Sequence, residues 1–121
     1  MVWILIINNE IESVSCFAIS DTESLLFVTT DQRTLSIFYR STYQEAWSLL
    51  LHTTSPHPDI YYTAVGCLPL ITSQASASTP STSVLVFLCG TDHHIEVNEL
   101  SIPSKSLQKL CTLTVFISYP S

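Results

Sequence analysis

The sequence is poor in charge, and especially in basic residues. Charged residues make up 12% of the 121, and four Lys and Arg stand against ten Asp and Glu, so the formal net charge is −6. Four scattered bases cannot neutralise a run of phosphates, which argues against binding to nucleic acid and against attraction to anionic membranes. A surface with so little charge is also prone to association with other proteins.

Glycines and catalytic motifs are scarce as well. The two glycines, Gly66 and Gly90, lie far apart in the sequence, whereas phosphate-binding loops need clustered glycines. The sequence has no GxSxG motif that would mark a nucleophile. We therefore predict a protein that is not an enzyme and that needs no cofactor.

The cysteine pattern excludes a CxxC site. Cys16, Cys67, Cys89 and Cys111 are widely spaced, and each lies in an apolar run. This favours free thiols in a reducing compartment. The alternative is a small secreted, disulfide-bonded β-sandwich binding protein in which the four cysteines form two pairs.

The N-terminal run MVWILII is apolar but short, and it lacks a basic start. It fits neither a secretory signal nor a membrane span, which needs about 20 apolar residues. We therefore expect a cytoplasmic protein without a membrane span.

Short apolar runs rich in Val, Ile, Phe, Tyr and Thr alternate with turn signals along the chain. These residues fit a half-buried β-sheet, so the sequence predicts a single all-β unit over residues 1–121. A helix over Tyr43–Leu51 is the best alternative, but the run SLLLHTT within and after it favours a strand. The expected strands are Val2–Ile7, Val14–Ser20, Leu25–Thr30, Thr34–Arg40, Trp47–Thr53, Tyr61–Leu68, Val84–Cys89, His94–Leu100 and Leu107–Ile117.

An internal repeat organises these runs. Residues 11–54 form the first unit and residues 61–117 the second, and the second contains a Ser/Thr-rich segment, 72–83, that we expect to be a flexible loop. The alignment matches Phe27–Asp31 with Leu88–Asp92 at an offset of 61 residues. Asp31 and Asp92 then lie in the turn of each central hairpin, where an aspartate can accept hydrogen bonds from backbone amides.

Four strands per unit, with a tight polar turn between the second and third, are typical of a β-propeller blade. The sequence therefore predicts two degenerate four-stranded blades of an incomplete propeller. A two-sheet β-sandwich is the alternative fold. Two blades do not close a ring, so an open piece would expose sheet edges that can pair with another chain, including a second copy.

The run Val86–Leu100, VFLCGTDHHIEVNEL, resembles the blade segment of kaptin-like proteins, which are related in architecture to WD-repeat propellers. In that segment an apolar strand is followed by Gly-x-Asp, two variable residues and a further strand. The run IESVSCFAISDTESLLFVTT, followed by TLSIFY, resembles the preceding blade, so the resemblance covers about Ile11–Leu100.

This resemblance implies a non-enzymatic scaffold that binds protein partners. Kaptin-like proteins are associated with actin and with the KICSTOR complex, which regulates TOR signalling at the lysosome. The resemblance therefore implies a cytoplasmic, lysosome-associated protein, and it transfers no catalytic residue.

Two groups of side chains remain as site candidates. Asp92, His94 and Glu96 are weak metal-ligand candidates, because residues two apart on a strand share one face. A polar hairpin turn without metal is the simpler explanation of the same residues. Tyr39, Arg40 and Tyr43 are the best candidates for an exposed aromatic-basic patch that contacts a partner.

Overall fold

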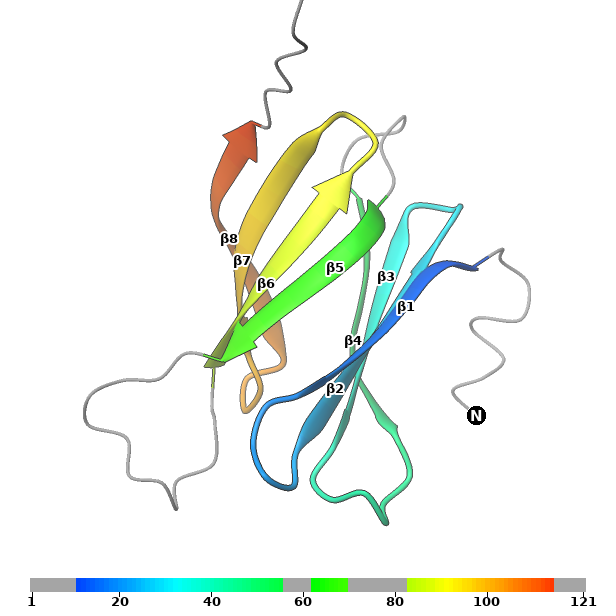
Figure 1. Cartoon of the computed structure of the whole chain (residues 1–121), viewed down its shortest axis with the longest axis vertical. Coiled ribbons are helices and arrows are strands. Elements are labelled where there is room, and N and C mark those ends of the chain that lie inside the picture. The colour runs from blue at the N-terminus through cyan, green and yellow to red at the C-terminus, as the bar shows by residue number, and fades with distance from the viewer. Residues whose placement is uncertain (1–10, 56–61, 70–82, 115–121) are drawn as a thin grey trace, which may run out of the picture.

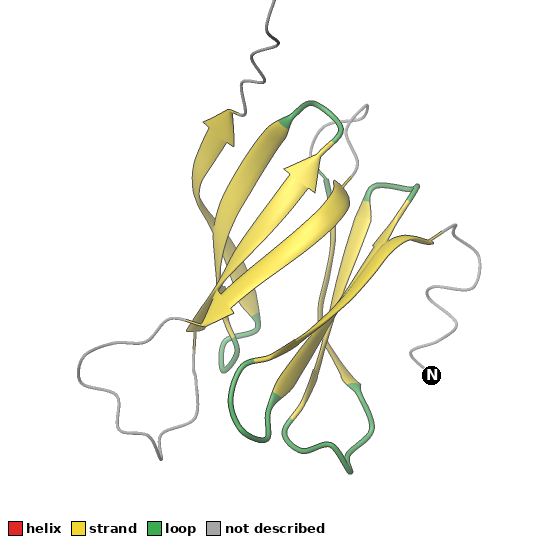
Figure 2. Cartoon of the chain, viewed as in Figure 1, coloured by secondary structure: helices red, strands yellow, loops and turns green. Residues whose placement is uncertain are grey.

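The computed structural model describes residues 11–55, 62–69 and 83–114, and within these ranges the chain has strands and no helix. The strands form two four-stranded antiparallel sheets, in the orders β1-β2-β3-β4 and β5-β6-β7-β8 (Figures 1 and 2). This confirms the predicted all-β fold. The strands are β1 (Ile11–Ala18), β2 (Ser24–Thr30), β3 (Thr34–Arg40), β4 (Ser48–Thr54), β5 (Tyr62–Pro69), β6 (Ser83–Gly90), β7 (His94–Ser101) and β8 (Ser106–Thr114).

Each of the eight strands coincides with an expected strand to within three residues, apart from the predicted end of the last one. The helical alternative over Tyr43–Leu51 is wrong. Its last four residues, Ser48–Leu51, belong to β4, which pairs with β3. Three expectations lie outside the described residues: the strand Val2–Ile7, the Ser/Thr-rich loop up to residue 82, and residues 115–117 of the last strand.

The two sheets repeat one another in register. Leu25 pairs with Tyr39 in the first sheet and Leu85 pairs with Glu99 in the second, so equivalent positions of the second and third strands are 60 residues apart. This corrects the offset of 61 expected from the sequence. Asp31 is therefore equivalent to Thr91, and Asp92 is equivalent to Gln32.

The β-bulges repeat as well. The register between the third and fourth strands shifts after Ile37 in the first sheet and after Val97 in the second, again at equivalent positions. The first and second strands of each sheet also carry a shift at equivalent places, next to Ile11 and next to Tyr62. Because a bulge interrupts the hydrogen-bond ladder at one defined place, its recurrence supports a common origin for the two sheets.

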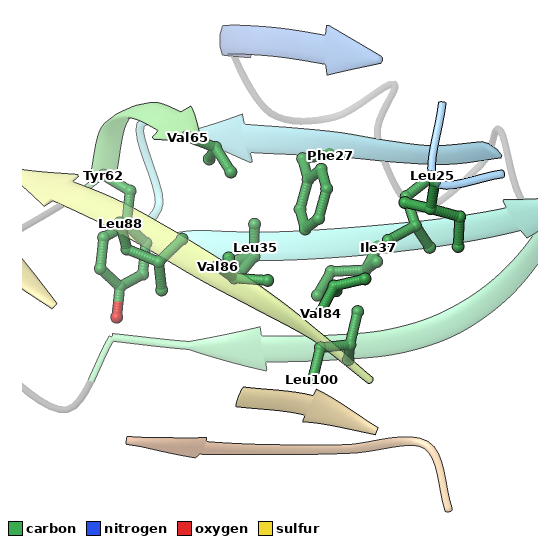
Figure 3. Packing of buried hydrophobic residues seen from close by; sticks show 11 residues of the cluster. Leu25, Phe27, Leu35, Ile37, Tyr62, Val65, Val84, Val86, Leu88 and Leu100 are labelled. Atoms are coloured by element: carbon green, nitrogen blue, oxygen red, sulfur yellow. The ribbon is translucent and has the colours of Figure 1, made fainter. Parts of the chain in front are cut away.

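One hydrophobic core lies between the sheets (Figure 3). Successive residues of a strand point to opposite faces, so alternate residues of β2 and β6 point into this core. Phe27 and Leu25 from the first sheet and Val84 and Val86 from the second are fully buried there. The backbones of the two sheets contact each other mainly where β5 lies beside β1 and β2. The remaining core residues are Ile19, Leu35, Ile37, Tyr62, Val65, Leu88 and Leu100.

Candidate functional site

A pocket of about 210 Å³ lies at one end of the second sheet, beside the β6–β7 turn. Its lining includes the core residue Leu88 and several polar side chains. The three weak metal candidates all contribute to it, together with a lysine that the sequence did not single out. The polar lining comprises Tyr62, Asp92, His94, Glu96, Lys109 and Thr112.

The turn that carries Asp92 has a defined local geometry. The backbone N–H of His93 donates to the carbonyl of Gly90 at 3.4 Å, and His93 has a φ of 64°. Asp92 Oδ1 accepts a hydrogen bond from the backbone N–H of His94 at 3.2 Å, and Asp92 Oδ2 lies 3.0 Å from His94 Nδ1. In the first sheet Thr30 has the corresponding role, since its Oγ1 accepts from the N–H of Gln32 at 3.3 Å.

Desolvation raises the pKa of Asp92, but the hydrogen bond from the His94 backbone and the charge of the His94 ring lower it by more. The net effect is a pKa below the usual value for an aspartate. The pair is partly exposed, with 41% of the His94 side chain accessible to solvent, so it contributes little to stability.

Glu96 makes a different contact from the other two candidates. The hydroxyl of Tyr62 donates to Glu96 Oε2 at 3.3 Å. Burial raises the pKa of Tyr62 to about 12, the charge of Glu96 acts in the same direction, and a hydrogen bond with Ser55 opposes them. Tyr62 therefore holds its proton and links β5 to β7 at the wall of the pocket.

The three candidates share a pocket without forming a ligand set. Asp92 is bound to His94, whereas Glu96 is bound to Tyr62. In residues 11–55, 62–69 and 83–114, no group of three or more His, Cys, Asp or Glu side chains is arranged to hold a metal ion. The pocket combines two carboxylates, an imidazole and the Lys109 ammonium with the apolar side chain of Leu88.

The predicted aromatic-basic patch is divided between the two faces of the first sheet. Tyr39 packs against the core, and its hydroxyl donates to Glu23 Oε2 at 2.6 Å. Burial raises the pKa of Tyr39 to about 12, with further contributions from Glu23 and Glu45. Arg40 and Tyr43 lie together on the opposite side, so Tyr39 does not belong to the patch.

Trp47, and not the predicted Tyr39, contacts Arg40 in this patch. The guanidinium carbon of Arg40 lies 4.2 Å from the centre of the Trp47 ring and 5.2 Å from that of Tyr43. These distances are typical of cation–π contacts. Tyr43 is 62% exposed, so this cluster is partly open to a partner. Alternation along β3 could have identified the error, because Tyr39 and Arg40 must point to opposite faces.

The outer face of the second sheet, which points away from the core, is apolar. Leu68 and Leu113 are 55% and 49% exposed there, and Phe87, Leu85 and Ile95 are only half-buried. The outer face of the first sheet is apolar too, with Val28 and Phe38 at its centre and the exposed Val14 and Cys16 on β1. Both sheets thus have apolar residues on both faces, a pattern expected of a sheet that is covered on both sides.

The chain matches no known protein family, and no curated protein and no solved structure is significantly similar to it. In the part of the chain that the structure describes, no helix is both long and apolar enough to cross a membrane.

Proposed function

We propose that this chain is a non-enzymatic protein-interaction module built from two propeller-type blades. The observation that carries the proposal is the way in which the repeated sheets stack. The face of the first sheet that contains Phe27 packs on the face of the second that contains Val86. These faces are not equivalent in the repeat, so the stacking runs front to back, as between neighbouring blades.

Two surfaces are available for partners. The apolar outer face of the second sheet offers Leu68 and Leu113, and the Arg40 cluster offers Tyr43 beside a stacked guanidinium. Aromatic and arginine side chains are enriched among residues that dominate binding energy. These surfaces support a binding role, and the four free cysteines and the pocket add no recognisable catalytic constellation among the described residues.

The narrower proposal is a kaptin-like scaffold that acts with the KICSTOR complex in TOR regulation at the lysosome and associates with actin. Its support is the resemblance of Val86–Leu100 and of the preceding repeat. Val86–Leu100 covers the C-terminal part of β6, the turn and most of β7, so the resembling residues include most of the central hairpin of the second sheet.

Co-precipitation tests this proposal. The tagged full chain, expressed in cells, should enrich KICSTOR subunits, and the purified chain should sediment with actin filaments. Leu113→Lys should weaken enrichment at least fivefold if the outer face of the second sheet is the contact. Thr22→Lys adds the same charge at an exposed position in the β1–β2 connection and should have no effect. Failure of both the enrichment and the sedimentation would contradict the kaptin-like assignment.

The secreted β-sandwich with two disulfides remains the second candidate, and the two-sheet architecture is compatible with it. In the structure all four cysteines are free thiols, and Cys16 and Cys111 are exposed. Titration of free thiols in the unfolded chain, without reductant, distinguishes this alternative from a module with four free cysteines. Four reactive thiols in protein purified from its own compartment would contradict the disulfide-bonded alternative.

A further inference from the structure

The outer face of the second sheet repeats the inner face of the first. Leu25, Phe27, Leu35 and Ile37 of the first sheet are fully buried beneath the second sheet. The register places Leu85, Phe87, Ile95 and Val97 at the equivalent positions of the second sheet. Two of the four residues are identical and the other two are conservative replacements, so the second sheet carries a copy of the surface on which it is itself docked.

The match extends to the bulge between the third and fourth strands. Leu50 and Leu110 are the unpaired residues at the two register shifts. Leu50 packs against the core between the sheets, whereas Leu110 is 51% exposed. The same bulge therefore presents the same side chain in both sheets, and only the first sheet has a neighbour that covers it.

The complementary surface is exposed along β1 only, because Val28 and Phe38 at the centre of the same face are buried with Trp47 and Leu49 of the same chain packed against them. Val65 and Cys67 of β5 belong to the core between the sheets, as does Phe17 of β1, and β5 lies beside β1 there. Their equivalents on the outer face of the first sheet are Val14 and Cys16, which are exposed. The equivalent of Phe17 is Leu68, which is 55% exposed on the outer face of the second sheet.

We propose that a second copy of this chain packs the outer face of its first sheet onto the outer face of the second sheet, and so continues the internal stacking between molecules. This rests on the blade-like stacking in the proposed function and names a partner for it. Leu68 of one copy then meets Val14 and Cys16 of the next.

Charge at the edge of this interface is complementary. Leu100 and Tyr39 pack against the same core between the sheets, and their equivalents are Arg40 and Glu99. The proposed stacking brings Arg40 of one copy towards Glu99 of the other.

The proposed interface is heterologous, because it joins two different faces. Contacts of this type close into rings when the rotation permits and otherwise extend into open assemblies. An isologous dimer would instead join one face to its own copy, and edge pairing would involve neither face. These alternatives predict different responses to substitutions on each face.

Light scattering after size-exclusion chromatography tests the proposal on the purified full chain. The mass of the wild-type chain should rise with concentration to at least twice 13.5 kDa. Leu68→Lys and Val14→Lys should each block one of the two faces, and each should raise the concentration needed for association at least tenfold. Both positions are more than half exposed, so neither variant should disturb folding, which circular dichroism and cooperative unfolding check.

Mixing the two variants gives the decisive result. The Leu68→Lys chain still has an intact outer face on its first sheet, and the Val14→Lys chain still has one on its second sheet. These two faces are complementary, so the mixture should form a 1:1 dimer that does not grow. A wild-type monomer at all concentrations, wild-type association that neither variant weakens, or a mixture that stays monomeric would overturn the proposal. None of these results depends on the co-precipitation test, so the two proposals can fail separately.

Discussion

Phe27 and Phe87 occupy equivalent positions in the two sheets, opposite Ile37 and Val97 respectively, but only Phe27 is covered by a second sheet. Phe27 is fully buried and packs edge-on against Phe17 at a centroid distance of 5.8 Å. Phe87 lies on the outer face and is half-buried. The same side chain in the same register therefore has two different environments.

This difference predicts unequal losses of stability. Phe27→Ala removes a fully buried ring and should lower the free energy of unfolding by about 3–5 kcal/mol. Phe87→Ala should cost less than about 2 kcal/mol in dilute solution, because water already reaches the ring. Urea denaturation measures both, with Phe27→Leu as the milder variant if the alanine does not fold. Equal losses would show that the outer face is covered even in the isolated chain.

Asn98 should be replaceable by an apolar residue with a gain in stability. Its side chain is 4% exposed in the core-facing row of β7, and its Nδ2 has no hydrogen-bond partner among the described residues. A buried unpaired polar group costs about 1–3 kcal/mol. The equivalent residue of the first sheet is the apolar Phe38. Asn98→Leu should therefore raise the free energy of unfolding by about 1 kcal/mol, and a loss of stability would indicate that the amide is bonded.

Alkaline pH should destabilise the fold through Tyr62. Its pKa in the folded chain is raised to about 12, whereas a phenol in the unfolded chain ionises near pH 10. The unfolded state therefore loses this proton first, and the stabilisation that is complete below about pH 10 is lost as the pH rises through about 12. Unfolding free energies across this range should fall less steeply for Tyr62→Phe than for the wild-type chain. Identical slopes would contradict the assignment.

Cys67 should be the slowest of the four thiols to react. Burial raises its pKa to about 11, and the thiolate is the reactive form. At neutral pH the thiolate fraction of a thiol with a pKa of about 11 is about 300-fold smaller than that of an unperturbed thiol with a pKa near 8.5. Cys67 should therefore react with a disulfide reagent up to about 300-fold more slowly than such a thiol, and more slowly than the exposed Cys16. The slowest kinetic phase should disappear in Cys67→Ser. Its persistence in that variant would assign it to another cysteine.

The β6–β7 turn should tolerate glycine better than a branched residue. His93 has a φ of 64°, in the left-handed region that glycine adopts without steric cost. His93→Gly should leave stability unchanged or raise it by up to about 1 kcal/mol, whereas His93→Val should lower it by about 1 kcal/mol or more. Chemical denaturation of the two variants measures the difference. Equal stabilities would show that the turn relaxes to another conformation.

Much of the fold could be predicted from local sequence. The run TLSIFYR gives β3 with the expected bounds, because β-branched and aromatic residues favour a strand and Thr30–Arg33 marks the preceding turn. The position of Asp92 in the second turn could also be predicted. The offset of the repeat could not, because aligning Asp31 with Asp92 gives 61 residues, whereas the strand register gives 60.

The candidate site could be predicted only in part. Asp92, His94 and Glu96 meet at one pocket, as their spacing suggests, but the partner of Glu96 is Tyr62 from a different hairpin. The pairing of Arg40 with Trp47 depends on how the chain between β3 and β4 returns, which has no local sequence signal.

By itself, the sequence determined the strands, the turns and the all-β class, because each depends on the preferences and alternation of neighbouring residues. Only the tertiary structure decided which faces meet. Phe27 and Phe87 have the same local sequence preferences, and their burial differs because a second sheet follows the first along the chain. That long-range packing fixes the register of the repeat and leaves an apolar face of the second sheet open.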